Sequence, residues 1–175
     1  GDIALVTNTL GNYNVGVGNG TLYSNTTASE NIAIGVNTMR VQSYSNGGSA
    51  YPTYNVAVGT NALYSNQPTN LANANYNTAI GDRVLYENTT GDRNTGLGAR
   101  AMQFSTTGRI NTAVGVDALR DNTSGNGNVA AGFEALFLNG TGSGNVGVGS
   151  FALRNANNKS FNVAVGASAL FVYNG

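Results

Sequence analysis

The chain of 175 residues carries eight basic and eight acidic side chains, so its formal net charge is zero, and its charged fraction of 9% lies far below the roughly 25% of an ordinary globular domain. This balance excludes a basic surface for nucleic acid, and no stretch approaches the roughly 20 apolar residues that span a bilayer. The sequence contains neither cysteine nor histidine, which excludes disulfides, thiolate metal sites and a histidine base. We therefore expect no cofactor and no metal, and the missing apolar stretch leads us to expect no membrane insertion.

A nine-residue pattern recurs from one end of the chain to the other. A degenerate copy opens at Asp2, and from Asn77 onward each copy begins 17 residues after the previous one. Full copies begin with asparagine at Asn14, Asn31, Asn55, Asn77, Asn94, Asn111, Asn128, Asn145 and Asn162. Strict spacing of this kind indicates an array of structural repeats. We expect one repeat domain, residues 1–175, within a longer fibre, because the chain begins almost on a repeat and stops soon after Leu170.

Positions in each repeat are numbered here from this asparagine. Position two is β-branched, position three is alanine or glycine, position four is mostly a larger aliphatic residue, and position nine is leucine or methionine. Positions two to four therefore predict a short strand in which positions two and four face one way and position three faces the other. Glycine at position five and the polar clusters between copies supply turns, and we expect a second short strand at position nine.

These elements predict the fold class. Two short strands and two turns in 17 residues are too few for a βαβ unit of about 30 residues, and no window sustains the helical period. The sequence therefore predicts an all-β fold, a parallel β-solenoid of about ten coils with a 17-residue repeat. We expect positions four and nine to fill the interior, and the position-one asparagines to stack as amides that hydrogen-bond from coil to coil.

Position three never holds a large side chain, so something must pack closely against it. That partner is either another wall of the same coil or the same strand of a neighbouring subunit. The second alternative makes this column a candidate trimer interface, because identical small residues in register along a rod suit association about a shared axis. The residues of the column are Gly16, Ala33, Ala57, Ala79, Gly96, Ala113, Ala130, Gly147 and Ala164.

Two early coils are longer than the others, at 24 residues from Asn31 and 22 residues from Asn55. The extra residues predict loops at about 40–54 and 64–76, which contain both prolines of the chain. Insertions in a solenoid often form its binding face. Candidate receptor or glycan contacts in or beside these loops are Tyr44, Tyr51, Tyr54, Tyr64 and Tyr76. The alternative interpretation is that these rings pack the loops against the rod.

Charged residues fall at equivalent positions of neighbouring coils. Asp92 and Arg109 are expected to form a surface ion pair. Asp117 and Glu134 lie one coil apart, a spacing at which two carboxylates can act together in a retaining glycosidase. Because Arg100 occupies the rung beside them and no apolar wall that would raise a carboxyl pKa is evident, we expect no catalytic residues.

The unit that begins at Asn111 reads Asn-Thr-Ala-Val-Gly-x-x-Ala-Leu-x-x-Asn-Thr-Ser-Gly-x-x. It resembles the head repeats of YadA-like trimeric autotransporter adhesins and related repeats in phage tail fibres, and the resemblance runs through nearly every copy. It implies a left-handed β-roll, a homotrimer, and exposure on a bacterial cell surface or a virion. The adhesin heads usually have a shorter repeat, so the 17-residue form is closer to the tail-fibre variety.

These observations predict a non-enzymatic, extracellular segment of a trimeric surface fibre, a tail fibre or an adhesin head. Its partners would be two further copies of itself and a cell-surface glycan or protein receptor. A monomeric surface-active solenoid such as an ice-binding protein is the alternative, although threonine fills position two in only three consecutive copies, Thr78, Thr95 and Thr112. A polysaccharide hydrolase that uses Asp117 and Glu134 is a third hypothesis.

Overall fold

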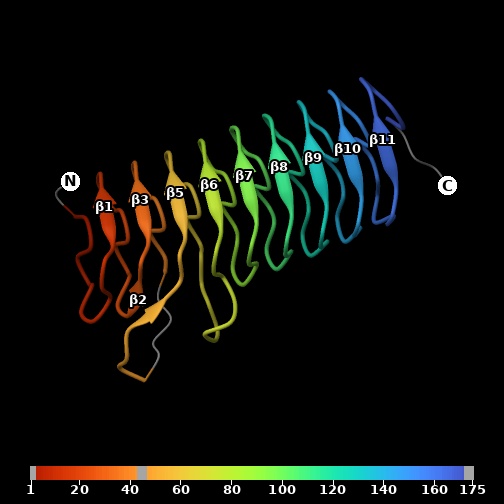
Figure 1. The fold of residues 1–175 in the computed structure, drawn as a ribbon. Coiled ribbons are helices and arrows are strands. Elements are labelled where there is room, and N and C mark those ends of the chain that lie inside the picture. Colours follow the sequence, from red (N-terminus) through yellow and green to blue (C-terminus); the bar gives the residue numbers. More distant parts are fainter. Residues whose placement is uncertain (1–2, 43–46, 172–175) are drawn as a thin grey trace.

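The computed structural model describes residues 3–42 and 47–171, which form a stack of coils without a helix in those two ranges. Nine three-residue strands lie side by side in one parallel sheet, in chain order along the stack (Figure 1). They are β1 (Val15–Val17), β3 (Ile32–Ile34), β5 (Val56–Val58), β6 (Thr78–Ile80), β7 (Thr95–Leu97), β8 (Thr112–Val114), β9 (Val129–Ala131), β10 (Val146–Val148) and β11 (Val163–Val165). The predicted all-β array is confirmed.

The register between strands follows the repeat. Each strand pairs position for position with the next copy, so that Thr95 lies beside Thr112 and Gly96 beside Ala113. The longer coils keep this register, because Ile32 still pairs with Val56 and Val56 with Thr78. The first insertion adds a second, two-stranded sheet made of β2 (Ala28–Ser29) and β4 (Tyr51–Pro52). The extra residues therefore leave the stack without shifting the main sheet.

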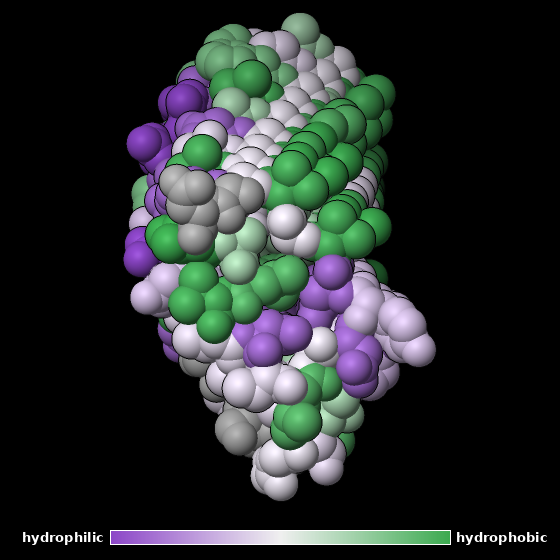
Figure 2. Space-filling model, turned by 90° about the vertical axis from the view of Figure 1, so that its left-hand side faces the viewer, coloured by the Kyte–Doolittle hydropathy of each residue, from purple (hydrophilic) through white to green (hydrophobic). Residues whose placement is uncertain are grey.

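The main strands alternate in facing direction as expected, but their inner and outer faces are the reverse of the prediction. The side chains at position four, such as Leu97 and Val114, are exposed, whereas the side chains at position three are buried inside the coil. Rows of hydrophobic side chains consequently run along the outside of the stack (Figure 2). The expected position-four interior was wrong because the narrow coil has room opposite position nine for little more than a methyl group.

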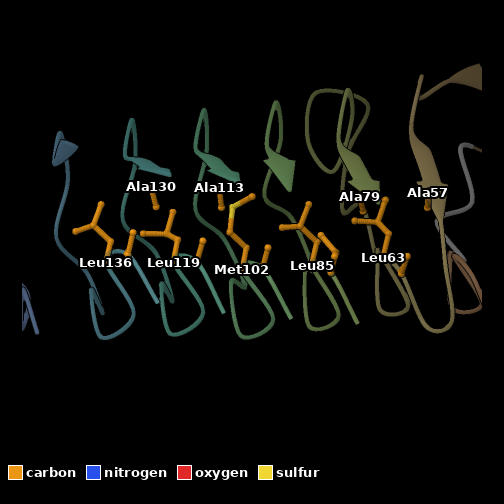
Figure 3. Close-up of a cluster of buried hydrophobic side chains, with 14 of the residues drawn as sticks. Ala57, Leu63, Ala79, Leu85, Met102, Ala113, Leu119, Ala130 and Leu136 are labelled. Atoms are coloured by element: carbon orange, nitrogen blue, oxygen red, sulfur yellow. The ribbon is translucent and has the colours of Figure 1, made fainter. Parts of the chain in front are cut away.

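The interior consists of position three packed against position nine. Ala113 and Ala130 point toward Met102, Leu119 and Leu136 on the facing wall (Figure 3), and all five are fully buried. A β-carbon added to Gly147 would lie 3.2 Å from Cγ of Leu136, so the leucine ladder already fills that space. Position eight, mostly alanine, lines the same core. In most coils, one large and two small apolar side chains are therefore removed from water.

The expected second strand at position nine was also wrong. The residue there has a left-handed backbone in every full copy, with φ of +52° at Leu119, and position seven does too, with φ of +57° at Asp117. Inter-coil hydrogen bonding continues nonetheless, because the Leu119 amide donates to the carbonyl of Ala135 at 2.8 Å. Left-handed residues in alternation bend the chain sharply, and this closes a coil within 17 residues.

The position-one asparagines form the predicted ladder. The backbone N–H of Asn111 donates to the side-chain Oδ1 of Asn94 at 3.0 Å, and the backbone N–H of Asn128 donates to Oδ1 of Asn111 at 2.9 Å. In most copies the side-chain Nδ2 also reaches across its own coil, as Asn111 does to the carbonyl of Gly125 at 2.9 Å. These amides are buried, and satisfied buried hydrogen bonds of this kind define a single register.

A second ladder, absent from the sequence predictions, occupies position twelve. Asn139 donates to Oδ1 of Asn122 at 2.8 Å, and Asn88 donates to Oδ1 of Asn66 at 2.9 Å. Both ladders converge on the same carbonyl groups, since Gly125 also accepts from Asn122 at 3.0 Å. The two amide columns therefore cross-link the turn that closes each coil.

Candidate functional site

Both insertions leave the stack on the same side, near its N-terminal end (Figure 1). The first reaches the rod again at β4, and the second, at about 67–74, rejoins it at Ala74, whose carbonyl accepts from Asn55 at 3.0 Å and from Asn66 at 3.1 Å. The asparagine ladders thus anchor the second loop, and the pairing of β4 with β2 anchors the first. This anchoring brings their side chains together at one corner of the rod.

A column of exposed side chains runs along this corner at the last residue before each position-one asparagine, position seventeen. Tyr54 and Tyr76 stack with ring centroids 5.1 Å apart and an interplanar angle of 17°. The guanidinium of Arg93, on the next coil, lies 5.7 Å from the centroid of the Tyr76 ring. All three have left-handed backbones, with φ between +54° and +58°. Both tyrosines remain partly exposed, Tyr54 by 41% and Tyr76 by 52%.

A hollow of about 370 Å³ opens between the two insertions. We call it the insertion hollow, and its lining residues are Tyr51, Pro52, Leu71, Ala72, Asn75, Tyr76 and Arg93. Asn75 is 5% exposed, its Nδ2 donates to the Leu71 carbonyl at 2.8 Å, and its buried Oδ1 has no hydrogen-bond partner among residues 3–42 and 47–171. The hollow therefore combines apolar walls with an amide, a phenol and a guanidinium.

Smaller hollows adjoin it on both sides. One of about 190 Å³ shares Tyr51 and Pro52 with it and extends to Tyr13 and Glu30. Another of about 280 Å³ shares Ala72 and extends to Arg109. The three together follow the same corner of the rod for about five coils, or about 24 Å at a strand spacing of about 4.8 Å.

The charge at this corner is positive where the second insertion meets the rod. Asp92 is 1% exposed and pairs with both Arg93 and Arg109, so one carboxylate faces two guanidinium groups. The hydrogen bond and the charge of Asp92 raise the pKa of Arg109 above its ordinary value. The predicted pair of Asp92 and Arg109 is confirmed, and Arg93 joins it. Arg93 is the one charged residue among the described residues that line the insertion hollow.

The structure brings some of the five candidate tyrosines together and separates others. Tyr54 and Tyr76 share the stack, and Tyr51 is buried in β4 beside them. Tyr64 lies at position ten instead, where it stacks on Tyr86 at 5.1 Å, outside the insertion hollow. Tyr44 lies outside the described residues. The glycan or receptor role of these residues stays a prediction.

The small-residue column lies inside its own coil, which is the first of the two alternatives raised by the sequence. Ala33, Ala57, Ala79, Ala113 and Ala130 have no exposed surface within a single chain, so they leave no surface for a second chain. The expected interface column is therefore corrected to an interior column. Gly16, half-buried under Leu5, belongs to the same wall.

The carboxylates of the hydrolase hypothesis are each held by an arginine. Arg100 donates from Nε to Oδ1 of Asp117 at 2.8 Å and from Nη2 to Oδ2 at 2.5 Å. Glu134 pairs with Arg154. Each of the two carboxylates therefore pairs with a different arginine.

A further ladder at position ten was missed by sequence reasoning. Arg120 lies 4.0 Å from the centroid of the Phe137 ring, and Arg154 lies 4.8 Å from that ring and 5.5 Å from the ring of Phe171. From Arg120 to Phe171, cations and rings therefore alternate along this edge of the rod. The signal that could have revealed it is the residue directly after position nine, which is aromatic or arginine in eight of the nine full copies.

Within the part of the chain that the structure describes, no three acidic side chains gather as a metal site would require. No helix there is long and apolar enough to cross a membrane. Comparison with known proteins finds no family model, no curated protein and no solved structure that matches this chain.

Proposed function

We propose that the chain is a non-enzymatic segment of a trimeric fibre, a left-handed β-roll exposed on a virion or bacterial cell, and that the insertion corner attaches it to a cell-surface glycan or protein. A phage tail fibre is favoured over an adhesin head because of the 17-residue repeat. The observation that carries the proposal is the exposed apolar face of the main sheet, which a single chain leaves uncovered.

This face consists of positions two and four of the nine main strands. Exposed hydrophobic side chains on it include Val15, Val17, Ile32, Ile34, Ile80, Leu97, Val114, Val129, Val148, Val163 and Val165. Nine strands about 4.8 Å apart make a face about 40 Å long. Monomeric soluble proteins rarely expose contiguous apolar patches of more than a few hundred Å². An occupant with the same repeat would match this face rung for rung, and further copies of the chain have that repeat.

Symmetry favours a closed assembly over an open one. Each copy presents the same straight apolar face along the rod axis, so copies arranged about a common parallel axis bury their faces together. Three copies follow from the resemblance to trimeric fibres. In that arrangement the insertions, which leave the rod at another corner, stay outside and available to a partner.

Light scattering over a dilution series tests the assembly. We expect about three times the monomer mass of 17.9 kDa, and we expect Val114→Lys to reduce it to a monomer without unfolding it, because residue 114 faces solvent in the isolated chain. Ile110→Lys is the matched control, an exposed apolar residue at position seventeen and outside the sheet face. A wild-type monomer with an intact circular dichroism spectrum would exclude the trimer. Binding of the labelled protein to whole bacteria would then test attachment separately.

One observation favours a second candidate, an ice-binding surface. Thr78, Thr95 and Thr112 pair in register on the exposed side of β6, β7 and β8. This row of hydroxyls is short, and hydrophobic residues occupy the rest of position two. Thermal hysteresis that disappears in Thr95→Leu would favour this function, and its absence in the wild type would exclude it.

A further inference from the structure

We propose that the insertion hollow binds a carboxylated sugar residue of a surface polysaccharide, with Arg93 on the carboxylate, the Tyr76 hydroxyl on a ring hydroxyl, and the apolar wall of Pro52 and Leu71 against the C–H face of the sugar. The inference rests on the proposed attachment function and names the chemical class of its ligand.

The volume and lining of the hollow suit a small ring rather than a protein surface. Ligand sites usually range from about 300 to 1,000 Å³ and combine apolar walls with a few placed polar groups. The insertion hollow has about 370 Å³, and its polar groups come from Asn75, Tyr76 and Arg93. Standard protein interfaces bury about 800 Å² on each partner around an apolar core. A hollow with one exposed leucine, Leu71, does not provide such a core.

The stacking geometry defines how Tyr76 can contact the ligand. Tyr54 covers one face of its ring at 5.1 Å and Arg93 lies over the other at 5.7 Å. A sugar ring therefore cannot stack on either face of Tyr76. Tyr76 is nevertheless 52% exposed, and its phenol hydroxyl can both donate and accept hydrogen bonds. This arrangement favours a hydroxyl-rich ligand over an apolar one.

Charge identifies the ligand as acidic. Asp92 neutralises one of the two arginines that contact it, which leaves one positive charge at the edge of the hollow. Arg93 already spans the gap between Asp92 and the Tyr76 ring, so its planar donors are held in place before a ligand arrives. A guanidinium binds a carboxylate through two parallel hydrogen bonds, a stronger contact than it makes with a neutral hydroxyl.

Asn75 lines the hollow with an amide that is not fully hydrogen-bonded. Its Oδ1 is buried and unpaired among the described residues, while its Nδ2 is fixed by the Leu71 carbonyl at 2.8 Å. An unpaired buried carbonyl oxygen is costly, and a turn of the Asn75 side chain toward the hollow would let a sugar hydroxyl donate to this oxygen and remove that cost. Asn75 Oδ1 needs a hydrogen-bond donor. A sugar hydroxyl can supply one, whereas a carboxylate ligand without hydroxyl groups cannot.

The experiment measures binding of the whole chain to a panel of hexuronate and nonulosonate oligosaccharides, each paired with its methyl ester. The ester keeps every hydroxyl and removes only the charge. We expect the acidic form to bind at least about tenfold more tightly than the ester, and to weaken as salt rises from about 0.05 to 0.5 M. Equal binding of the two forms, or no binding of any acidic member, would overturn the proposal.

Matched variants locate the site. Arg93→Gln should remove the preference for the acidic form, whereas Arg120→Gln, which lies on the Phe137 ring at position ten, should retain it. Tyr76→Phe keeps the stack and removes the hydroxyl, and Tyr86→Phe is its control, since Tyr64 and Tyr86 stack at the same 5.1 Å. We expect several-fold weaker binding in Tyr76→Phe alone.

Whole-cell binding separates failure of the ligand from failure of the function. If the wild type binds bacteria and Arg93→Gln binds them equally well, the acidic-sugar site is wrong and attachment stands. If binding to cells is lost after their surface carboxyl groups are chemically reduced, and Arg93→Gln binds untreated cells poorly, both proposals are supported. If the wild type binds no cell tested, the attachment function fails, and the oligosaccharide titration alone decides the site.

Discussion

Ser105 lies one coil beyond Asn88 in the position-twelve ladder, and the two side chains do not bond. Asn88 Oδ1 and Ser105 Oγ are both buried, and neither has a hydrogen-bond partner among the described residues. Elsewhere in this ladder an asparagine donates to the one before it, as Asn139 does to Asn122 at 2.8 Å. Serine is too short to span the same distance, so the ladder is interrupted at this rung.

Replacement of Ser105 by asparagine should restore the missing bonds. The new amide can donate to Asn88 Oδ1 and accept from Asn122, so we expect the free energy of unfolding to rise by about 1–2 kcal/mol. Denaturant melts measure the change. Ser124→Asn, at an exposed position, is the control and should be close to neutral. A less stable Ser105→Asn variant would mean that the coil cannot accommodate the longer side chain.

The inward direction of position three can be tested with two neighbouring residues. Ala113→Leu inserts three carbon atoms into a filled core and should destabilise the protein by about 1–3 kcal/mol or more. Val114→Leu adds one methylene to the apolar outer face, where either solvent or the proposed neighbouring chain lies, and should change thermal stability much less than Ala113→Leu. A reversal of this order, with residue 114 the sensitive one, would contradict the assignment of the inner and outer faces.

Two glycines should respond differently to alanine although both have positive φ. Gly115 has a φ of +135°, and a β-carbon there would lie 2.5 Å from the carbonyl oxygen of Gly132. Gly127 has a φ of +64°, with no atom within 4 Å of the same added carbon. We expect Gly115→Ala to unfold the local coils, whereas Gly127→Ala should cost only about 1–2 kcal/mol, the strain of a left-handed alanine. Hydrogen exchange around residue 132 would report the difference, and equal protection in both variants would argue against it.

The position-ten ladder should couple its members energetically. Arg120 lies 4.0 Å from the centroid of the Phe137 ring, and a cation over a ring contributes about 0.5–1 kcal/mol at exposed sites. A double-mutant cycle of Arg120→Gln and Phe137→Leu should therefore give a coupling free energy of about that size. The same cycle with Arg109 in place of Arg120 is the control, because Arg109 pairs with Asp92 at another position of the coil. A coupling free energy near zero in both cycles would show that Arg120 and Phe137 are neighbours because of the repeat but do not stabilise each other.

Much of the fold could be predicted from the sequence because the repeat determines it. The 17-residue period established the parallel register, and the invariant asparagine indicated its own ladder. The prediction that positions two and four face one way and position three the other was also confirmed. Which face points inward depends on the diameter of the coil, and the diameter depends on the left-handed backbone at residues such as Asp117 and Leu119. Leucine rarely adopts that conformation, so its sequence pattern gave no sign of it.

The candidate site was only partly accessible from the sequence. The insertions and Tyr76 were visible as departures from the period. Arg93 could not be recognised in the sequence as a site residue, because it lies outside both insertions. It contacts Tyr76 only because the two coils are stacked. Asn75 resembled any other polar loop residue, and its unpaired oxygen becomes evident only when all neighbouring donors are placed. Contacts between adjacent coils therefore create most of the site.

The position-twelve ladder has a practical consequence for how the protein can be made. Asn25, Asn88, Asn122 and Asn139 each begin an Asn-x-Ser/Thr triplet, the acceptor sequence for N-linked glycosylation, and all four side chains are fully buried. A eukaryotic secretory host attaches its oligosaccharide while the chain is still unfolded. Each modified amide would then be unable to enter the coil, so such a host should yield misfolded protein where a bacterial cytoplasm yields the intact rod.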